Sequence, residues 1–386
     1  MPTKSRSGLP MRAALLSVSL IIGSQTAISP ALPAMVEQFS DQSRNAVESL
    51  TTIQCLPIIL MVMASALLAE RFGKKRVVAF GVALSAIAGT VPLVCQDYPV
   101  ILVSRLVFGV GIGCLNGLAV SLVGDFFEGQ ERATLMGVRS SMETLSTAVL
   151  SALVGVLVAF GWRWAFSIYL IGVPILAAFV LLVPDPPAPA REATDASGEK
   201  AGHALNAEVV GLAIFSGLIC MVANGFVIRV PSIVEGQVMG TAVEASLVVS
   251  ATTVSGTVAG IAYGSLHRLL GRHVVTLACV LMVAGTFLCY VADSVLALGV
   301  AGVLLDFAWP LVISHVMNMV PERCADGATT LSTAFVVAAT ATTSLFAPTA
   351  LNVIGAVMGS ASLAAPFAAY AVMTACLGVW WVVRLG

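Results

Sequence analysis

Three ionisable residues interrupt long apolar stretches, and their chemistry suits proton transfer. Asp306 lies ten residues into the apolar run 296–319, about 15 Å deep at the rise of an α-helix, and Glu143 lies at a similar depth in its own run. A charged side chain in hydrocarbon costs at least ~2.5 kcal/mol, so such residues usually mark a functional site. Arg105 could attract an anion or favour the charged form of a neighbouring acid. We therefore expect Asp306, Glu143 and Arg105 to take part in proton coupling.

Each of these three residues also has a structural interpretation. Asp306 could be paired permanently with a neighbouring group. Arg139 lies one helical turn before Glu143 on the same face, so the two charges could simply neutralise each other. Arg105 could make a fixed structural contact.

Polar side chains in other apolar runs are candidates for binding a substrate. Gln25, Asn116, Asn224 and Trp309 lie within such runs, and we expect them to contact a ligand. Arg229 lies about twenty residues into its run, near the outer interface. We expect its long side chain to reach water there, with anion binding at the mouth of a cavity as the alternative.

The composition requires a membrane environment for these residues. The chain is 58% hydrophobic and only 10% charged, and its mean hydropathy is +0.99. Soluble proteins carry roughly 25% charged residues, so this chain lacks the charge to cover a surface in water. The apolar runs are continuous rather than alternating, which indicates helices and not a β-barrel.

About 20 apolar residues cross a membrane as a helix, and the chain offers twelve such runs. They are predicted at 11–34, 46–69, 76–95, 98–124, 133–159, 163–183, 208–234, 241–266, 274–292, 296–319, 327–352 and 362–384. A polar segment rich in proline and charge divides them into two sets of six. We expect a six-helix bundle at 1–183, a linker at 184–207 and a second bundle at 208–386.

The distribution of Lys and Arg predicts the orientation. These residues gather in the loops on the side of the N-terminus, for example at Lys74, Lys75 and Arg132, whereas the opposite loops hold only Arg44 and Arg163. Lys and Arg concentrate on the cytoplasmic side of membrane proteins. Both termini and the linker are therefore predicted to be cytoplasmic.

The two halves of the sequence are related by a weak repeat. Pro33-x-x-x-Glu37 ends the first run and Pro231-x-x-x-Glu235 ends the seventh. The interval of 198 residues between Pro33 and Pro231 also separates Gly73 from Gly271, in the turns after the second and eighth runs. A constant interval indicates a duplicated six-helix unit, which is typical of transporters.

Three motifs carry a resemblance to a known family. The turn ALLAERFGKKR at 66–76 resembles motif A of the major facilitator superfamily, with Ala for the first glycine and Glu for the acid, and Gly73 supplies a tight turn. RLVFGVG, beginning at Arg105, resembles motif B, and GWRWAF at 161–166 resembles the entry to the sixth span. The GPxxGG motif of drug:proton antiporters is reduced at 150–155 to Gly155 alone.

This resemblance implies a fold and a conformational latch. The chain is identified as an all-α membrane protein with twelve transmembrane helices in two pseudo-symmetric six-helix bundles, closest to the drug:proton antiporter type. Spans 1, 4, 7 and 10 line the cavity of the family, which favours Asp306 over Glu143. The acid of motif A faces the start of span 11, and its cations reach the acid that ends span 4. The latch residues implied here are Glu70, Arg71, Gly73, Lys74 and Asp125.

The function predicted from these features is secondary active transport by alternating access, with proton-coupled efflux of a small amphipathic compound of low net charge. The alternatives are proton-coupled uptake of an organic anion or nutrient, and a non-transporting sensor on the same fold. Nucleophile–base, Walker and HExxH motifs are absent from the sequence, so an enzyme is not predicted. We expect no cofactor, no metal and no nucleic acid, and we expect a monomer in the plasma or inner membrane whose partners are substrate, protons and lipid.

Overall fold

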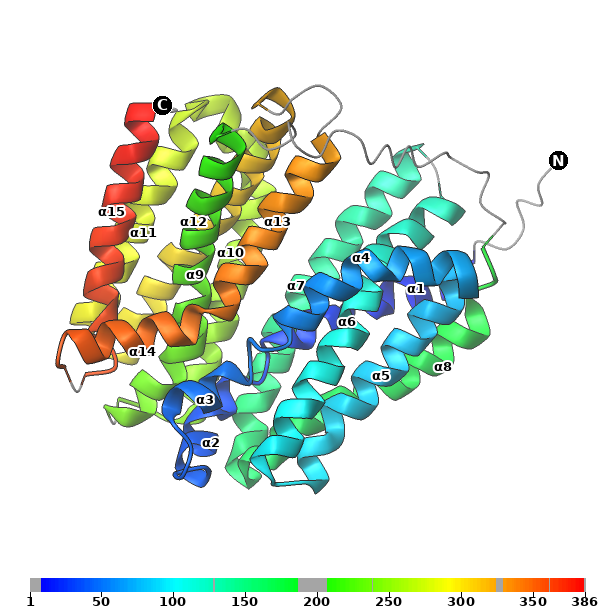
Figure 1. The fold of residues 1–386 in the computed structure, drawn as a ribbon, viewed down its shortest axis with the longest axis horizontal. Coiled ribbons are helices and arrows are strands. Elements are labelled where there is room, and N and C mark those ends of the chain that lie inside the picture. Colours follow the sequence, from blue (N-terminus) through cyan, green and yellow to red (C-terminus); the bar gives the residue numbers. More distant parts are fainter. Residues whose placement is uncertain are drawn as a thin grey trace. The chain divides into compact units, whose positions relative to one another are not determined.

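The computed structural model describes residues 8–127, 129–186, 207–237, 239–323, 329–360 and 362–384, and every regular element in these ranges is a helix (Figure 1). In the first half of the chain the elements are α1 (Leu9–Ile22), η1 (Gly23–Gln25), η2 (Ser29–Ala31), α2 (Leu32–Gln38), α3 (Arg44–Ser49), α4 (Cys55–Phe72), α5 (Lys74–Val94), α6 (Tyr98–Phe126), α7 (Gly129–Leu157), η3 (Val158–Phe160), η4 (Trp162–Ile171) and α8 (Gly172–Leu182). In the second half they are α9 (Ala207–Gly236), α10 (Ala242–Leu270), α11 (His273–Val291), α12 (Val295–Arg323), α13 (Thr329–Leu345), α14 (Ala347–Val357) and α15 (Pro366–Arg384).

Most of these helices are long and apolar enough to cross a membrane. Ten pass this test within the described residues, and an eleventh span is added if Phe335–Leu345 and Ala347–Val357, bent by 49°, count as one. The protein is therefore an all-helical, multi-pass membrane protein, as predicted. The described residues thus account for ten or eleven of the twelve predicted spans.

The predicted span 46–69 is not one continuous helix. The chain forms α3, a turn at 50–54, and then α4. Within the turn, the Thr51 hydroxyl donates to the Glu48 carbonyl over 2.8 Å, and Pro57 in the first turn of α4 has no amide hydrogen to extend a helix backwards. Apolar composition predicted the run, but these local contacts break it.

The described chain forms two compact units. One contains residues of 1–34 and 53–194, and the other contains 35–52 together with residues of 195–386. In the first unit, α6 packs on both α4 and α5, and α7 packs on α1. In the second, α12 packs on α10 and α11, and α9 packs on α13. The short segment 35–52 thus lies between two helices of the first unit in sequence and belongs to the second unit in space.

A glycine follows the second predicted span in each half of the sequence. Gly73 after α4 has φ 90°, and Gly271 after α10 has φ 53°, a region that side chains with a Cβ rarely adopt. The predicted tight turn at Gly73 is confirmed, and its repeat partner shares the feature. α10 also begins with a reciprocal cap between Thr241 and Glu244.

Candidate functional site

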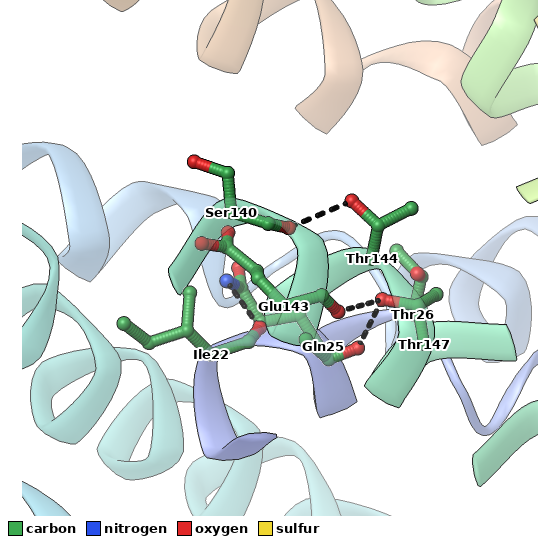
Figure 2. Close-up of a pocket in the computed structure, with 8 residues that line it drawn as sticks. Ile22, Gln25, Thr26, Ser140, Glu143, Thr144 and Thr147 are labelled. Atoms are coloured by element: carbon green, nitrogen blue, oxygen red, sulfur yellow. Dashed lines mark hydrogen bonds between the residues drawn. The ribbon is translucent and has the colours of Figure 1, made fainter. Parts of the chain in front are cut away.

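A polar cavity of about 420 Å³ lies in the first unit, between α7 and the end of α1. Figure 2 shows that the Gln25 and Glu143 side chains border it together. Sequence reasoning assigned these two residues to different roles, substrate binding and proton coupling, and did not predict that they share a cavity. The full lining is Ile22, Gly23, Gln25, Thr26, Ser140, Glu143, Thr144 and Thr147.

A break in the first span places Gln25 in this cavity. α1 ends at Ile22 and gives way to the 3-10 turn Gly23–Gln25, whose carbonyls lack regular helical partners. Side chains of α7, of η4 and of the turn before α4 donate hydrogen bonds to the carbonyls at this break. The donor–carbonyl pairs are Ser146–Leu20 (2.7 Å), Thr147–Gly23 (2.7 Å), Tyr169–Ser24 (3.3 Å) and Gln54–Gln25 (2.8 Å). The break is therefore a defined structural feature that neighbouring helices stabilise.

The cavity is rich in hydrogen-bond acceptors. Thr144 and Thr147 direct their hydroxyl hydrogens to backbone carbonyls, of Ser140 and Gly23 respectively, which leaves the lone pairs of these hydroxyls free to accept. Among the described lining residues Glu143 is the one ionisable group, and Arg139 lies 3.5 Å from its carboxylate. Such a site suits a ligand that donates N–H or O–H groups, with Arg139 as the internal counter-ion of Glu143.

Arg105 lies in an aromatic cage on α6 and is fully buried. Its guanidinium donates to the Tyr169 hydroxyl (3.1 Å) and to the Gly89 carbonyl (3.2 Å), and it stands 4.9–5.1 Å from the ring centroids of Phe108, Phe166 and Tyr169. Cation–π contacts stabilise such a buried charge. This is the fixed structural contact that we gave as the alternative. A role for Arg105 in proton coupling stays a prediction.

Arg229 does not reach solvent, contrary to the expectation from its depth. The residue is 2% exposed, and its guanidinium donates a hydrogen bond of 3.0 Å to the Glu48 carboxylate, which is fully buried. The Asn352 amide donates to the same carboxylate oxygen over 2.9 Å. Arg229 stays buried because the Glu48 carboxylate neutralises its charge there, and hydropathy alone cannot reveal such a partner. Sequence reasoning missed Glu48, although an acid in the predicted span 46–69 was a signal for it.

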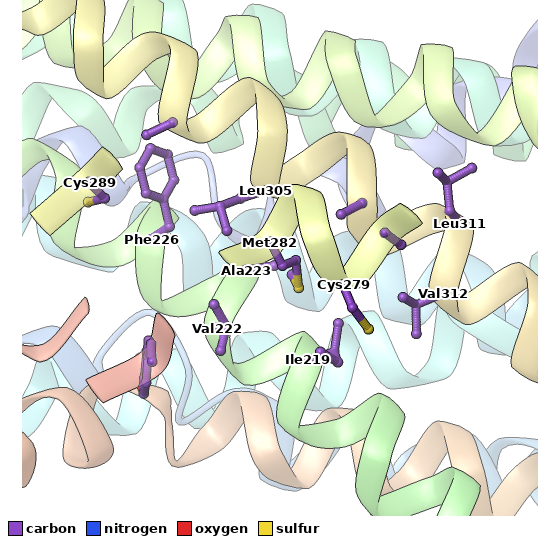
Figure 3. Packing of buried hydrophobic residues seen from close by; sticks show 14 of the residues in the cluster. Ile219, Val222, Ala223, Phe226, Cys279, Met282, Cys289, Leu305, Leu311 and Val312 are labelled. Carbon is purple, nitrogen blue, oxygen red and sulfur yellow. The ribbon is translucent and has the colours of Figure 1, made fainter. Parts of the chain in front are cut away.

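Asp306 lies on α12, next to Leu305 of the hydrophobic core of the second unit, where Phe226 and Met282 also pack (Figure 3). Thr252 of α10 lies beside this carboxylate, and its hydroxyl donates a hydrogen bond to the Val249 carbonyl over 2.8 Å. Within the described part of the chain, no Lys or Arg forms an ion pair with it. The permanent ion pair that was the alternative for Asp306 is thus not seen in these residues.

The remaining candidates for substrate binding are not among the described residues that line the cavity at Gln25. Asn224 is in the second unit, where its amide donates to the Cys220 carbonyl (3.1 Å) and to the Ser344 hydroxyl (3.1 Å). Trp309 is in the same unit and packs half-buried against its core. Asn116 is half-buried on α6 of the first unit. Their contact with substrate remains a prediction.

The turn that resembles motif A holds an ion pair. The Lys74 ammonium lies 2.7 Å from the Asp125 carboxylate at the end of α6, so the predicted contact between them is formed. Glu70 is exposed, and Arg71 stands over the ring of Phe72 at 5.6 Å. The place of Glu70 at the start of span 11, and the action of this turn as a latch, stay predictions.

A model of the Major Facilitator Superfamily matches residues 14–348, most of the chain. The chain belongs to the major facilitator superfamily. Members of this family are transporters and not enzymes. The predicted family is therefore confirmed.

Similar superfamily members include drug exporters. The chain is 28% identical to the multidrug resistance protein MdtL of Escherichia coli over 193 residues, 47% of this chain and 48% of that protein. It is 29% identical to the bacillibactin exporter of Bacillus subtilis over 161 residues, 39% of each chain. The matched regions therefore span less than half the length of these curated relatives.

Solved structures of the superfamily share the fold. The nucleoside transporter NupG superposes with a TM-score of 0.80 at 12% identity, covering 98% of this chain and 100% of that one. A D-xylose-proton symporter gives 0.73 at 15% identity, covering 97% and 96%. At such identities the likeness shows the fold alone.

Proposed function

We propose that this superfamily member is a proton-coupled exporter of small amphipathic compounds of low net charge. It works by alternating access between two six-helix halves. It acts as a monomer in the plasma or inner membrane, with both termini and the linker 184–207 in the cytoplasm. The exporters among its relatives support the direction of transport.

The observation that carries the proposal is the environment of Asp306. A carboxyl group in a membrane-spanning helix, beside the Thr252 hydroxyl and without an ion pair among the described residues, is able to gain and lose a proton. The Thr252 hydroxyl donates to the Val249 carbonyl, so its lone pairs are free to accept a hydrogen bond from the protonated form of Asp306. Asp306 is therefore the proton carrier in this proposal, and Glu143, already paired with Arg139, is secondary.

The charges near the candidate sites favour a neutral or cationic ligand over an anion. Uptake of an organic anion would use Arg105 and Arg229 as contacts. Arg105 is enclosed by aromatic rings, and Arg229 is paired with Glu48. Releasing either guanidinium would leave another buried group without its partner. The acceptor-rich cavity at Glu143 instead suits ligands that donate hydrogen bonds.

Proton movement in proteoliposomes tests the proposal. The vesicles have an acidic lumen that contains a pH-sensitive dye. One of two probes is added outside: ethidium, a singly charged amphipathic compound, or a dianionic sugar phosphate. Antiport predicts uptake of ethidium with alkalinisation of the lumen, abolished when the pH gradient is collapsed. Saturable uptake of the dianion, with no movement of ethidium, would instead support the alternative of anion uptake.

A further inference from the structure

A buried polar cluster fastens the segment 35–52 to the second unit. Its centre is the Glu48 carboxylate, which accepts hydrogen bonds from Arg229 of α9 and Asn352 of α14 through one oxygen. The other oxygen lies 3.6 Å from Arg44. Glu48 is fully buried and Arg229 is 2% exposed, so this is an interior ion pair and not a surface one.

A second contact places the same segment at the bend between α13 and α14. The Thr52 hydroxyl donates to the Leu345 carbonyl over 3.3 Å, at the last residue of α13. α3 itself packs on α14, the helix that follows the 49° bend. Residues 35–52 therefore contact both sides of this bend, while the chain on either side of them belongs to the first unit.

We propose that Glu48, Arg229 and Asn352 form a releasable latch, which holds segment 35–52 on the second unit and opens by local detachment of that segment. A buried ion pair contributes little net stability compared with apolar packing, and its best-attested use is to specify one of two arrangements. Among the described residues, Glu48 Oε1 and Arg229 Nε have no hydrogen-bond partner, although Oε1 lies within ion-pair distance of Arg44. The cluster thus fixes one arrangement of the segment while leaving some of its hydrogen-bonding capacity unused. Opening it would therefore break few hydrogen bonds.

The latch would link the two units through the covalent chain. Segment 35–52 begins within α2 (Leu32–Gln38) and ends shortly before α4, and the chain on both sides of it belongs to the first unit. The motif A turn with Lys74 and Asp125 is a separate contact inside the first unit. Glu48 therefore belongs to a different unit from the motif A turn.

Hydrogen exchange followed by mass spectrometry tests the latch without any substrate. In Glu48→Gln, peptides covering 44–52 should exchange roughly tenfold faster or more, because an unpaired Arg229 charge disfavours the closed state. Peptides of α9 and α14 should keep their protection. Glu208→Gln is the matched control: its ion pair with Arg323 has the same 3.0 Å length but is largely exposed, so it should change nothing at 44–52.

Two further variants keep the test decisive if Glu48→Gln folds poorly. Asn352→Ala removes one hydrogen bond and no charge, so a rise of only a few-fold at 44–52 is expected. The double variant Glu48→Gln with Arg229→Gln should exchange more slowly there than Glu48→Gln alone, since no unpaired charge remains. Unchanged exchange at 44–52 in Glu48→Gln and Asn352→Ala would overturn the latch. An equal rise throughout α9 and α14 would also overturn it, because the cluster would then stabilise the whole unit.

Discussion

The Arg105 guanidinium donates a hydrogen bond of 3.1 Å to the Tyr169 hydroxyl, and the two residues join α6 to η4. The same hydroxyl donates to the Ser24 carbonyl in the break of the first span. The most deeply buried arginine of the first unit is thus connected, through one tyrosine, to the turn that places Gln25 in the polar cavity. Two structural roles follow for Arg105: its cation packs among aromatic rings, and through Tyr169 it supports this turn.

Tyr169→Phe tests the connection. The change keeps the ring and removes the hydroxyl, so Arg105 loses an acceptor and the Ser24 carbonyl loses a donor. We expect a loss of about 1–3 kcal/mol in stability, measured as a lower thermal midpoint in detergent. Tyr290→Phe is the control, because Tyr290 is 45% exposed and its loss of a hydroxyl should have little effect. Equal thermal midpoints for the two variants would show that the Tyr169 hydroxyl does not stabilise this part of the protein.

Glu143→Gln tests the cavity as a ligand site. Removing the charge should weaken ethidium binding about tenfold or more, since a cationic ligand loses its counter-charge and Arg139 is left unpaired beside it. Fluorescence titration measures the affinity. Glu131→Gln changes an exposed acid of the same helix, paired with Arg12. Affinity that falls equally in both variants, or in neither, would show that the cavity does not bind this probe.

The motif A turn should affect transport more than stability. Lys74 and Asp125 are partly exposed, so Asp125→Asn should cost less than about 1 kcal/mol of stability. We expect a several-fold lower ethidium transport rate and partial recovery in the charge-exchanged pair Lys74→Asp with Asp125→Lys. A transport rate equal to that of the natural protein in Asp125→Asn would argue against a latch at this turn.

A reversible disulfide tests whether the segment 35–52 must detach during transport. Glu48 and Asn352 hydrogen-bond across the packed helices α3 and α14, so Glu48→Cys with Asn352→Cys is the pair to test for a disulfide on mild oxidation, with loss of the two free thiols measured first. We expect oxidation to stop ethidium transport and reduction to restore it. The single variant Glu48→Cys controls for the native cysteines and should not respond to oxidant. Full transport by the oxidised pair would mean that this contact stays closed throughout the cycle.

Hydropathy predicted the helical membrane fold, and the resemblance of three motifs to those of a known family predicted the family and the Gly73 turn. They could not predict the break at Gly23–Gln25, because its carbonyls are satisfied by side chains such as Ser146 and Tyr169, more than a hundred residues away in sequence. The pairing of Arg229 with Glu48 has the same origin. A single sequence shows where a charge lies along the chain but not which distant residue neutralises it.

The measurement that tests proton coupling most directly compares two kinds of transport in Asp306→Asn. Uphill ethidium accumulation driven by a pH gradient requires a proton carrier, whereas exchange of labelled for unlabelled ethidium at equal pH does not. We predict that Asp306→Asn loses the accumulation and keeps the exchange, and that Asp293→Asn, which alters an exposed acid of the same unit, keeps both. Undiminished accumulation in Asp306→Asn would contradict the assignment of Asp306 as the proton carrier.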